Sequence, residues 1–539
     1  MAKLTDQDRL GEIAAAVQRN GGVSIAAAKE LGVSKDVVHR ALKALGISGK
    51  DLVEGRVAPP KREVLPLPEK GMIARYIFTA AQSNTNVNDA VWENLTALAY
   101  VYEARILISR FTYKKEAYGV KAVKPGKAAT ASDKADLWFD ARIEPFVCDQ
   151  SLEVAPGLVW CGEMQISPTA VRPLSGLDSY TGRASSIFPH TKIAMESVAS
   201  HKTEATKFMY TTGAVTLGNY IAKKAGQKAE FHHGYGGLLV EVDSEGNWWC
   251  RQLNADGEGT IYDLSWRAKG GQVTEGNWVE GINWGDIHVG TVPTEVFEAC
   301  WGERGMARAL LPKYQFFHDV LDFRSQNHHD RHNPHLRFKK FLAGESDVLG
   351  EMYQVALFLQ ATRVAGTKSV VVDSNHDNAF KRWLREHDYR HDPQNALVFL
   401  RAQLAVYEAI RDEDENFHIV EWQLRKIAPE LSSVKFLRCD ESFVICPDAN
   451  GGIECGMHGH LGVNGARPNV HSFSKMGRKA NVGHTHSASI HDGLYTAGVV
   501  GSLDQGYNAG PSSWSHSNVV TYANGKRAVV TIWGGRWRA

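Results

Sequence analysis

The chain has 539 residues, 43% of them hydrophobic and 22% charged, and its 61 Lys and Arg against 60 Asp and Glu leave a net charge of +1. This length predicts two to four domains, and the composition is that of a soluble globular protein. The balanced charge excludes a protein that binds nucleic acid through its overall charge, so any basic surface must be local.

The cysteines and the N-terminus indicate the compartment. The seven cysteines are scattered and include no C-x-x-C pair, which favours reduced thiols in a cytosol over a disulfide framework. No apolar run approaches 18 residues, and the opening MAKLTDQDRLGEI lacks the apolar core of a signal peptide. We therefore expect a cytoplasmic protein without a membrane segment.

Residues 1–53 are expected to form a helix-turn-helix domain. The segments SIAAAKEL and KDVVHRALKALGI are joined by Gly32-Val33-Ser34, and an Ala-rich helix, a tight turn and a helix that opens with polar residues are typical of this motif. The second helix carries the side chains expected to meet DNA, which are Lys35, His39, Arg40 and Lys43. The alternative is a small helical bundle for protein interactions, because a fold alone does not prove binding.

The next segment, residues 54–71, is rich in proline and charge and is expected to be a linker. Residues 72–280 are expected to form a middle α/β domain to which we assign no chemistry. The stretches ARYIFTAA, NDAVWENLTALAYVYEA and RILISRFTY predict a strand, a helix and a second strand. The stretch GGLLVEVDSEGNWWCRQL predicts a hairpin.

Residues 281–539 carry five short motifs in which a strand-like stretch ends in a loop with metal-ligand side chains. These are Asp286 and His288, then Asp319 after an aromatic strand, then Asn375-His376-Asp377, then His458 and His460, then His484 and His486. Residues i and i+2 of an extended segment point the same way, so each D-x-H or H-x-H pair can hold one ion. The amphipathic stretch DVLGEMYQVALFLQATRV lies between the second and third motifs. It predicts strand–helix–strand, with the ligands at the carboxyl ends of the strands.

The donor groups are carboxylates, an amide and imidazoles, without a thiolate. This set disfavours a structural zinc site and suits Mn²⁺ foremost, with Fe²⁺ or catalytic Zn²⁺ as alternatives. Seven donors are too many for one tetrahedral ion. Two divalent ions about 3.5–4 Å apart that share a carboxylate would use them all, and such pairs cleave phosphoesters. A single H-x-H is more often incidental, but five ordered motifs at strand ends indicate a site.

This series of motifs resembles the calcineurin-like metallophosphoesterases, in particular their repair-exonuclease branch, over residues 281–539. The resemblance implies a β-sandwich flanked by helices that holds two ions. For the first ion it implies the ligands Asp286, His288, Asp319 and His486. For the second it implies Asp319, Asn375, His458 and His484, with Asp319 as the bridge.

The resemblance also assigns roles beside the metals. His376 matches the family's non-ligand histidine, which stabilises the transition state or protonates the leaving oxygen, and Asp377 matches the acid that orients it. The sequence departs from the family at His318 and Ser374, where the family has glycine. Asp322 is a second candidate for the bridging carboxylate, and His460 is a second candidate for the role of His458.

A metal pair predicts hydrolysis of a phosphoester by an activated hydroxide, with general-acid assistance from a histidine. The expected helix-turn-helix favours DNA as the partner and substrate, and therefore a DNA nuclease. The alternatives are a phosphatase or cyclic-nucleotide phosphodiesterase, and a non-catalytic DNA-binding scaffold, although every ligand position is filled. The whole chain more loosely resembles the early DNA-transfer nucleases of tailed phages, which degrade host DNA and assist genome entry. That resemblance implies work in the host cytoplasm, and we expect a homo-oligomer.

Overall fold

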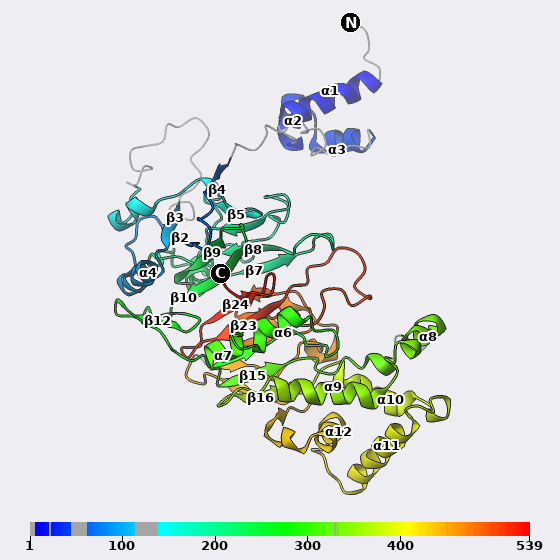
Figure 1. The fold of residues 1–539 in the computed structure, drawn as a ribbon. Helices are drawn as coiled ribbons and strands as arrows, with labels where there is room; N and C mark the ends of the chain where they lie inside the picture. Colours follow the sequence, from blue (N-terminus) through cyan, green and yellow to red (C-terminus); the bar gives the residue numbers. More distant parts are fainter. Residues whose placement is uncertain are drawn as a thin grey trace. The chain divides into compact units, whose positions relative to one another are not determined.

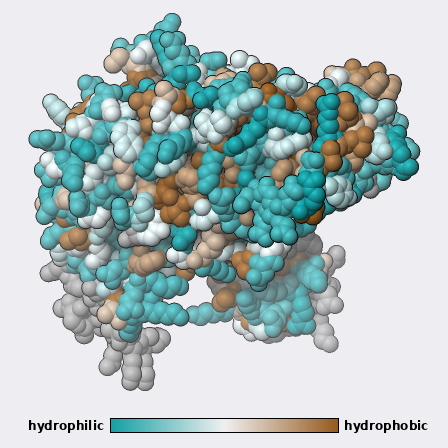
Figure 2. Space-filling model, turned by 90° about the horizontal axis from the view of Figure 1, so that it is seen from below, coloured by the Kyte–Doolittle hydropathy of each residue, from teal (hydrophilic) through white to brown (hydrophobic). Residues whose placement is uncertain are grey.

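The structure, a computed structural model, describes residues 6–20, 23–44, 62–113, 137–327, 330, 332–449 and 451–539. The chain divides into two compact units, residues 1–63 and residues 64–539 (Figure 1). Among the described residues, no helix combines the length and the apolar character needed to cross a membrane. The surface seen in Figure 2 is mostly hydrophilic, with hydrophobic residues in scattered groups.

The first unit contains the helices expected near the N-terminus. They are α1 (Asp6–Arg19), α2 (Ser24–Glu30) and α3 (Lys35–Ala44). Small and β-branched residues such as Ala16, Ala27 and Val38 are fully buried between them. Gly32, with φ +63°, makes the turn before α3, a conformation that glycine adopts without penalty. The cationic side chains expected to meet DNA, Lys35, His39, Arg40 and Lys43, are all exposed on α3.

The second unit begins with a four-stranded sheet in the order β10-β9-β2-β3. Its elements are β2 (Ile73–Gln82), α4 (Asp89–Val101), β3 (Arg105–Phe111), β9 (Gly236–Asp243) and β10 (Trp248–Asn254). Strands β2 and β3 are parallel and joined through α4, which confirms the expected strand–helix–strand unit. Strands β9 and β10 form the expected antiparallel hairpin.

A long sheet of eleven strands crosses the middle of the second unit. In spatial order its strands are β1 (Glu63–Val64), β4 (Ser151–Ala155), β5 (Leu158–Cys161), β6 (Ser185–Phe188), β8 (Lys207–Thr211), β7 (Met195–Val198), β21 (Ser489–His491), β22 (Leu494–Thr496), β20 (Lys479–Val482), β19 (Ile453–Glu454) and β18 (Val444–Ile445). Met195 pairs with Ile490, so strands from both sides of residue 280 belong to one sheet. The regions expected as separate domains, 72–280 and 281–539, therefore share a core.

The expected linker, residues 54–71, falls partly outside the described residues, which resume at 62. Its last part is packed rather than free. Leu65 is buried, and its backbone N–H donates to the carbonyl of Glu153 at 2.9 Å. This segment therefore lies along the edge of the long sheet.

A six-stranded sheet carries the C-terminal motifs. Its order is β17 (Lys435–Phe436), β16 (Lys368–Val371), β15 (Tyr314–Phe317), β14 (Gly281–Asn283), β23 (Ser517–Thr521) and β24 (Arg527–Thr531). Strands β14 to β17 are parallel, and β23 and β24 are antiparallel to their neighbours. A small sheet of β11 (Ile261–Asp263), β12 (Trp266–Lys269) and β13 (Gln272–Thr274) lies apart from it in the sheet topology.

Alternation along the central strands places this sheet between two layers. On β15, Phe316 packs with Ile445 and Ile453 of the long sheet, whereas the next residue, Phe317, packs with the helices. Successive residues of a strand point to opposite faces, so a strand covered on both sides is apolar throughout. The covering helices include α6 (Thr294–Trp301), α7 (Met306–Leu310), α9 (Val348–Ala361) and α12 (Ile419–Ile427).

The remaining helices of the described part are α5 (Lys224–Phe231), α8 (Pro334–Leu342), α10 (Asp377–Glu386), α11 (Ala396–Arg411) and α13 (Val470–Phe473). Strand β15, helix α9 and strand β16 realise the strand–helix–strand unit expected between the second and third motifs. Helices α8, α10 and α11 lie toward one end of the α9 layer (Figure 1).

Candidate metal centre

Four of the seven expected ligands lie at the carboxyl ends of three neighbouring parallel strands, and the other three, His458, His484 and His486, follow β19 and β20 of the long sheet. Asp286 and His288 follow β14, Asp319 follows β15, and Asn375 follows β16. Backbone hydrogen bonds continue the sheet register into these loops, since the N–H of His288 donates to the carbonyl of Asp319 at 2.8 Å. This is the edge at which α/β sheets place their ligands.

Four of the expected ligands have a left-handed backbone. The φ angles are +48° at His288, +47° at Asp319, +71° at His484 and +57° at His486. A non-glycine residue in this region is strained by about 1–3 kcal/mol, and such residues cluster at functional sites. The surrounding structure therefore holds these side chains in positions that local backbone preference would not select.

The first donor set is the one that the family resemblance implied. Asp286, His288, Asp319 and His486 are all buried, and one donor atom of each lies within 4.8 Å of the others. His486 Nε2 is 3.0 Å from Asp286 Oδ2 and 3.0 Å from His288 Nε2. His288 Nε2 is 3.8 Å from Asp319 Oδ2. The four donor atoms are therefore close enough together to share one ion.

The second donor set adjoins the first through Asp319. His458 Nε2 lies 3.4 Å from Asp319 Oδ2 and donates to Asn375 Oδ1 at 3.0 Å. The ring of His484 is 5.2 Å from the ring of His458, centroid to centroid. His460 lies in the same ring cluster, 5.3 Å from His458. Asp319 thus faces both donor sets, which is the position that a bridging carboxylate needs.

The unpaired buried atoms of this site fit a cation. In the described part, the carboxylate oxygens of Asp286 and Asp319 lack hydrogen bonds of good geometry although His486 and His458 stand 3.0 and 3.4 Å away, and Nδ1 of both histidines lacks a partner. Burying unpaired carboxylates is expensive unless a positive charge compensates them. Carboxylate and imidazole donors together suit a divalent transition metal.

The charge states of the histidine donors agree with metal binding, whereas Asp286 would have to lose its proton to bind a cation. Burial lowers the pKa of His484 and of His486 to about 4, so both rings are neutral near pH 7. Burial and the charge of Asp319 raise the pKa of Asp286 well above its usual value. Burial would also raise the pKa of Asp319, but the neighbouring His458, His376 and His288 hold it well below. Neutral imidazole and carboxylate are the forms that bind metals.

The acid in contact with His376 is Asp322, whereas the sequence analysis expected Asp377 in this position. His376 Nδ1 lies 3.1 Å from Asp322 Oδ1, and His288 Nδ1 lies 3.0 Å from the same oxygen. Asp377 is the first residue of α10, and its carboxylate accepts from Ser374 Oγ at 3.0 Å instead. Burial would lower the pKa of His376, but Asp319 and Asp322 raise it to about 10.

His318 is a candidate ligand that the sequence interpretation treated only as a departure from glycine. It is fully buried, neither of its ring nitrogens has a hydrogen-bond partner among the residues that the structure describes, and it forms a possible ligand group with Asp286 and His458. Burial lowers its pKa to about 4. Its position directly before Asp319, at the end of an apolar strand, was the available signal.

The site opens into a cleft of about 790 Å³. Its walls include Asp319, Asn375, His376, His484 and His486 from the donor sets, the cations Arg324 and Lys340, and the aromatic Tyr507 and Trp514. The ring of Trp514 stands edge-on to His486 at 4.2 Å. The exposed cations of α3 lie in the other compact unit.

The fold and the buried donors define an α/β protein that could hold metal ions at the carboxyl ends of parallel strands. Protein A1 of Escherichia phage T5 is similar to this chain, with 38% identity over 478 residues, which is 86% of this chain and 83% of that protein. The chain therefore belongs to the family of phage T5 Protein A1. No family model matches the sequence, and no solved structure matches the fold.

Proposed function

We propose that the protein is a dinuclear metal-dependent phosphodiesterase of the metallophosphoesterase type, and that its substrate is DNA. The observation that carries the proposal is the position of Asp319. Its carboxylate lies between Asp286, His288 and His486 on one side and His458 and Asn375 on the other. Such a shared carboxylate is what a metal pair for phosphoester cleavage requires.

Two divalent ions, when bound, would supply a hydroxide near neutral pH and neutralise the phosphate oxygens. The chain's own residues position the reaction. Asp322 holds Nδ1 of both His288 and His376, which fixes the orientation of each ring. Because Nδ1 of His376 is occupied and the side chain lines the cleft, Nε2 is left to donate to the leaving oxygen. The ring of Trp514 packs against that of His486, 4.2 Å away between centroids, and supports its orientation.

DNA as the substrate is supported by charge. The cleft carries Arg324 beside the donor sets, where its ion pairs with Asp322 and Glu345 are long at 3.8 Å, and α3 exposes four side chains that can carry positive charge. Phosphate contacts of this kind supply most non-specific DNA affinity. Membership in a phage protein family agrees with a proposed role in degradation of host DNA or in phage DNA transfer. The name Protein A1 itself states no function.

The test is hydrolysis by the purified chain with Mn²⁺ on linear DNA, plasmid DNA and p-nitrophenyl phosphate. We expect DNA cleavage that EDTA abolishes and that His376→Ala lowers by about 10²–10⁴-fold. Asp412→Asn, at the exposed end of α11, is the matched control and should cleave as the unaltered chain does. Turnover of the small ester with intact DNA would instead favour a phosphatase, and DNA binding without turnover would favour a scaffold.

A further inference from the structure

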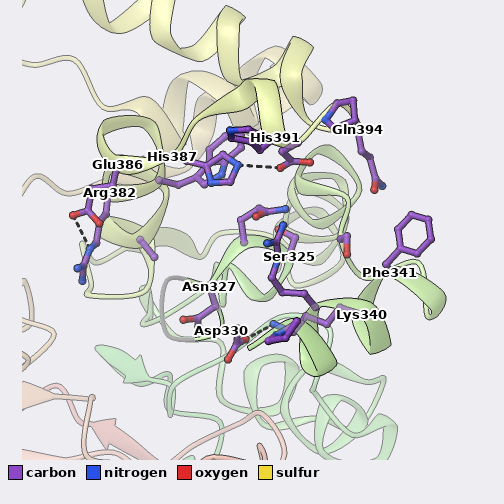
Figure 3. A pocket seen from close by; sticks show the side chains of 18 residues that line it. Ser325, Asn327, Asp330, Lys340, Phe341, Arg382, Glu386, His387, His391 and Gln394 are labelled. Atoms are coloured by element: carbon purple, nitrogen blue, oxygen red, sulfur yellow. Dashed lines mark hydrogen bonds and ion pairs between the residues drawn. The ribbon is translucent and has the colours of Figure 1, made fainter. Parts of the chain in front are cut away.

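A second cavity of about 420 Å³ lies beside the metal cleft and has no role in the mechanism above. The cavity and the metal cleft adjoin, because both are lined by Asn327, Asp330, Lys340 and Ala379. In Figure 3 the labelled Lys340 and Asp330 lie on one side of the cavity, and Arg382 and His387 lie across from them. A volume near 400 Å³ is at the small end of ligand pockets and fits a ligand the size of one nucleotide.

Helix α10 links this cavity to the metal centre. The helix begins directly after His376, and the side chains that line the cavity, Ala379, Arg382, Trp383 and Glu386, follow the i, i+3, i+4, i+7 spacing of one helical face. From His376 to Trp383 the helix rises by about 10 Å. That distance corresponds to about three stacked nucleotides of one strand. A strand held at the metals would therefore reach the cavity within a few nucleotides.

The chemistry of the cavity suits a nucleotide. Lys340 pairs with Asp330, and Arg382 donates to Glu386 at 2.9 Å. Arg337, on α8, has no acidic partner among the described residues, which leaves a cation for a phosphate. One turn further along α8, Phe341 is 64% exposed at the cavity wall and offers an open aromatic face. Bases stack on such faces irrespective of sequence, and cations follow the backbone.

A buried donor and several amides complete the wall. Trp383 is only 5% exposed, and its indole Nε1–H has no hydrogen-bond partner in the described part. Gln326 and Gln394 present amide groups that can both donate and accept, as base edges require. A purely apolar ligand would leave these groups unpaired.

We propose that this cavity binds one nucleotide of a single-stranded DNA segment that continues from the phosphate held in the metal cleft. Its base would stack on Phe341 and its phosphate would meet Arg337. The inference rests on the proposed function, because it takes the scissile strand to lie at the metals. A base inside a duplex cannot enter such a cavity. The protein should therefore prefer DNA with an unpaired stretch next to the cleavage site.

Helix α8 supplies matched variants for the test. Phe341→Ala and Arg337→Ala change the cavity wall, and Phe338→Ala and Lys339→Ala change neighbouring residues that do not line it. All four side chains are exposed, so none of the changes removes a core contact. Two substrates are compared, both with Mn²⁺. The first is a 20-nucleotide single strand, which can span the cleft and the cavity. The second is bis(p-nitrophenyl) phosphate, which is too short to do so.

We expect Phe341→Ala to lower the ratio of kcat/KM for the oligonucleotide to kcat/KM for the small ester by about tenfold, through KM. Binding of the same oligonucleotide, followed by fluorescence anisotropy in EDTA, should weaken by a similar factor. Arg337→Ala should reduce the slope of log Kd against log salt concentration by about 0.7, the value of one lost phosphate contact on a single strand. Phe338→Ala and Lys339→Ala should keep both the ratio and the slope.

Unchanged KM, Kd and salt slope in Phe341→Ala and Arg337→Ala would overturn the inference, as would equal losses in the two control variants. Failure of the proposed function has a different signature, which is no turnover of either substrate by the unaltered chain. In that case the anisotropy measurements of oligonucleotide binding alone test whether the cavity binds a nucleotide.

Discussion

Replacing Gly483 with alanine should disable the metal centre although no ligand is replaced. A Cβ at this position would lie 2.2 Å from Asp286 Oδ1 and 3.2 Å from Cγ of His318. Ordinary contact begins near 3.4 Å, so the carboxylate must retreat by about 1.2 Å from the other donors. A misplacement of about 1 Å in a catalytic group lowers the rate by about 10²-fold, which is about 2.7 kcal/mol of transition-state stabilisation.

The assay compares Gly483→Ala with Gly257→Ala, because a Cβ at Gly257 would meet nothing within 4 Å. We expect Gly483→Ala to lower kcat for DNA by about 10²-fold and to weaken Mn²⁺ binding in isothermal titration. The crowding should also lower the free energy of unfolding by about 1–3 kcal/mol, as measured by urea denaturation. If Gly483→Ala bound Mn²⁺ with unchanged affinity and stoichiometry, Asp286 would not be a ligand in this geometry.

Further changes test the bridge, the orienting acid and a buried ion pair. Asp319→Ala should be the most damaging single substitution. In titration with Mn²⁺ it should abolish binding of both ions. Retention of both ions and full activity would show that another group bridges them. Asp322→Asn should lower kcat by about 10–100-fold, whereas Asp377→Asn should lower it less, and the reverse order would restore the role first expected for Asp377. The last prediction concerns the buried ion pair of Glu241. Burial alone would raise the pKa of Glu241, but Arg251 and Arg75 lower this pKa to about 2. Because the folded pKa lies below the unfolded value of 4.5, this stabilisation is complete above pH 4.5 and is lost as the pH falls toward 2. The loss should be about 3 kcal/mol in urea denaturation across that range, and it should be absent in Glu241→Gln.

The elements that sequence reasoning predicted well are those with local signals. Strand β15, helix α9 and strand β16 follow from hydrophobic periodicity, and parallel pairing then brings Asp319 and Asn375 to one edge. The composition of the first donor set came instead from the family resemblance, because periodicity does not tell which histidines join Asp286 and Asp319. Sequence proximity pointed to Asp377, whose carboxylate accepts from Ser374, while Asp322 reaches His376 from the loop after β15.

The sharing of one sheet by both halves of the second unit had no local signal. Met195 pairs with Ile490, and no periodicity links two short strands that are so far apart in sequence. The role of His318 was hidden for a related reason. Whether a histidine next to a ligand points into a site depends on the packing around it, which here comes from Gly483 and His458.

The neighbours of strand β14 determine when its sheet can be completed during synthesis. Its residues 281–283 pair on one side with β15 and on the other with β23, residues 517–521. At ordinary translation rates the ribosome needs roughly 10–50 s to travel from the first of these strands to the last. During that interval the nascent polypeptide lacks both the closing strand and the histidines that precede it. An unfinished chain is therefore inert, and whatever reactivity the centre possesses arises only after most of the polypeptide has left the ribosome.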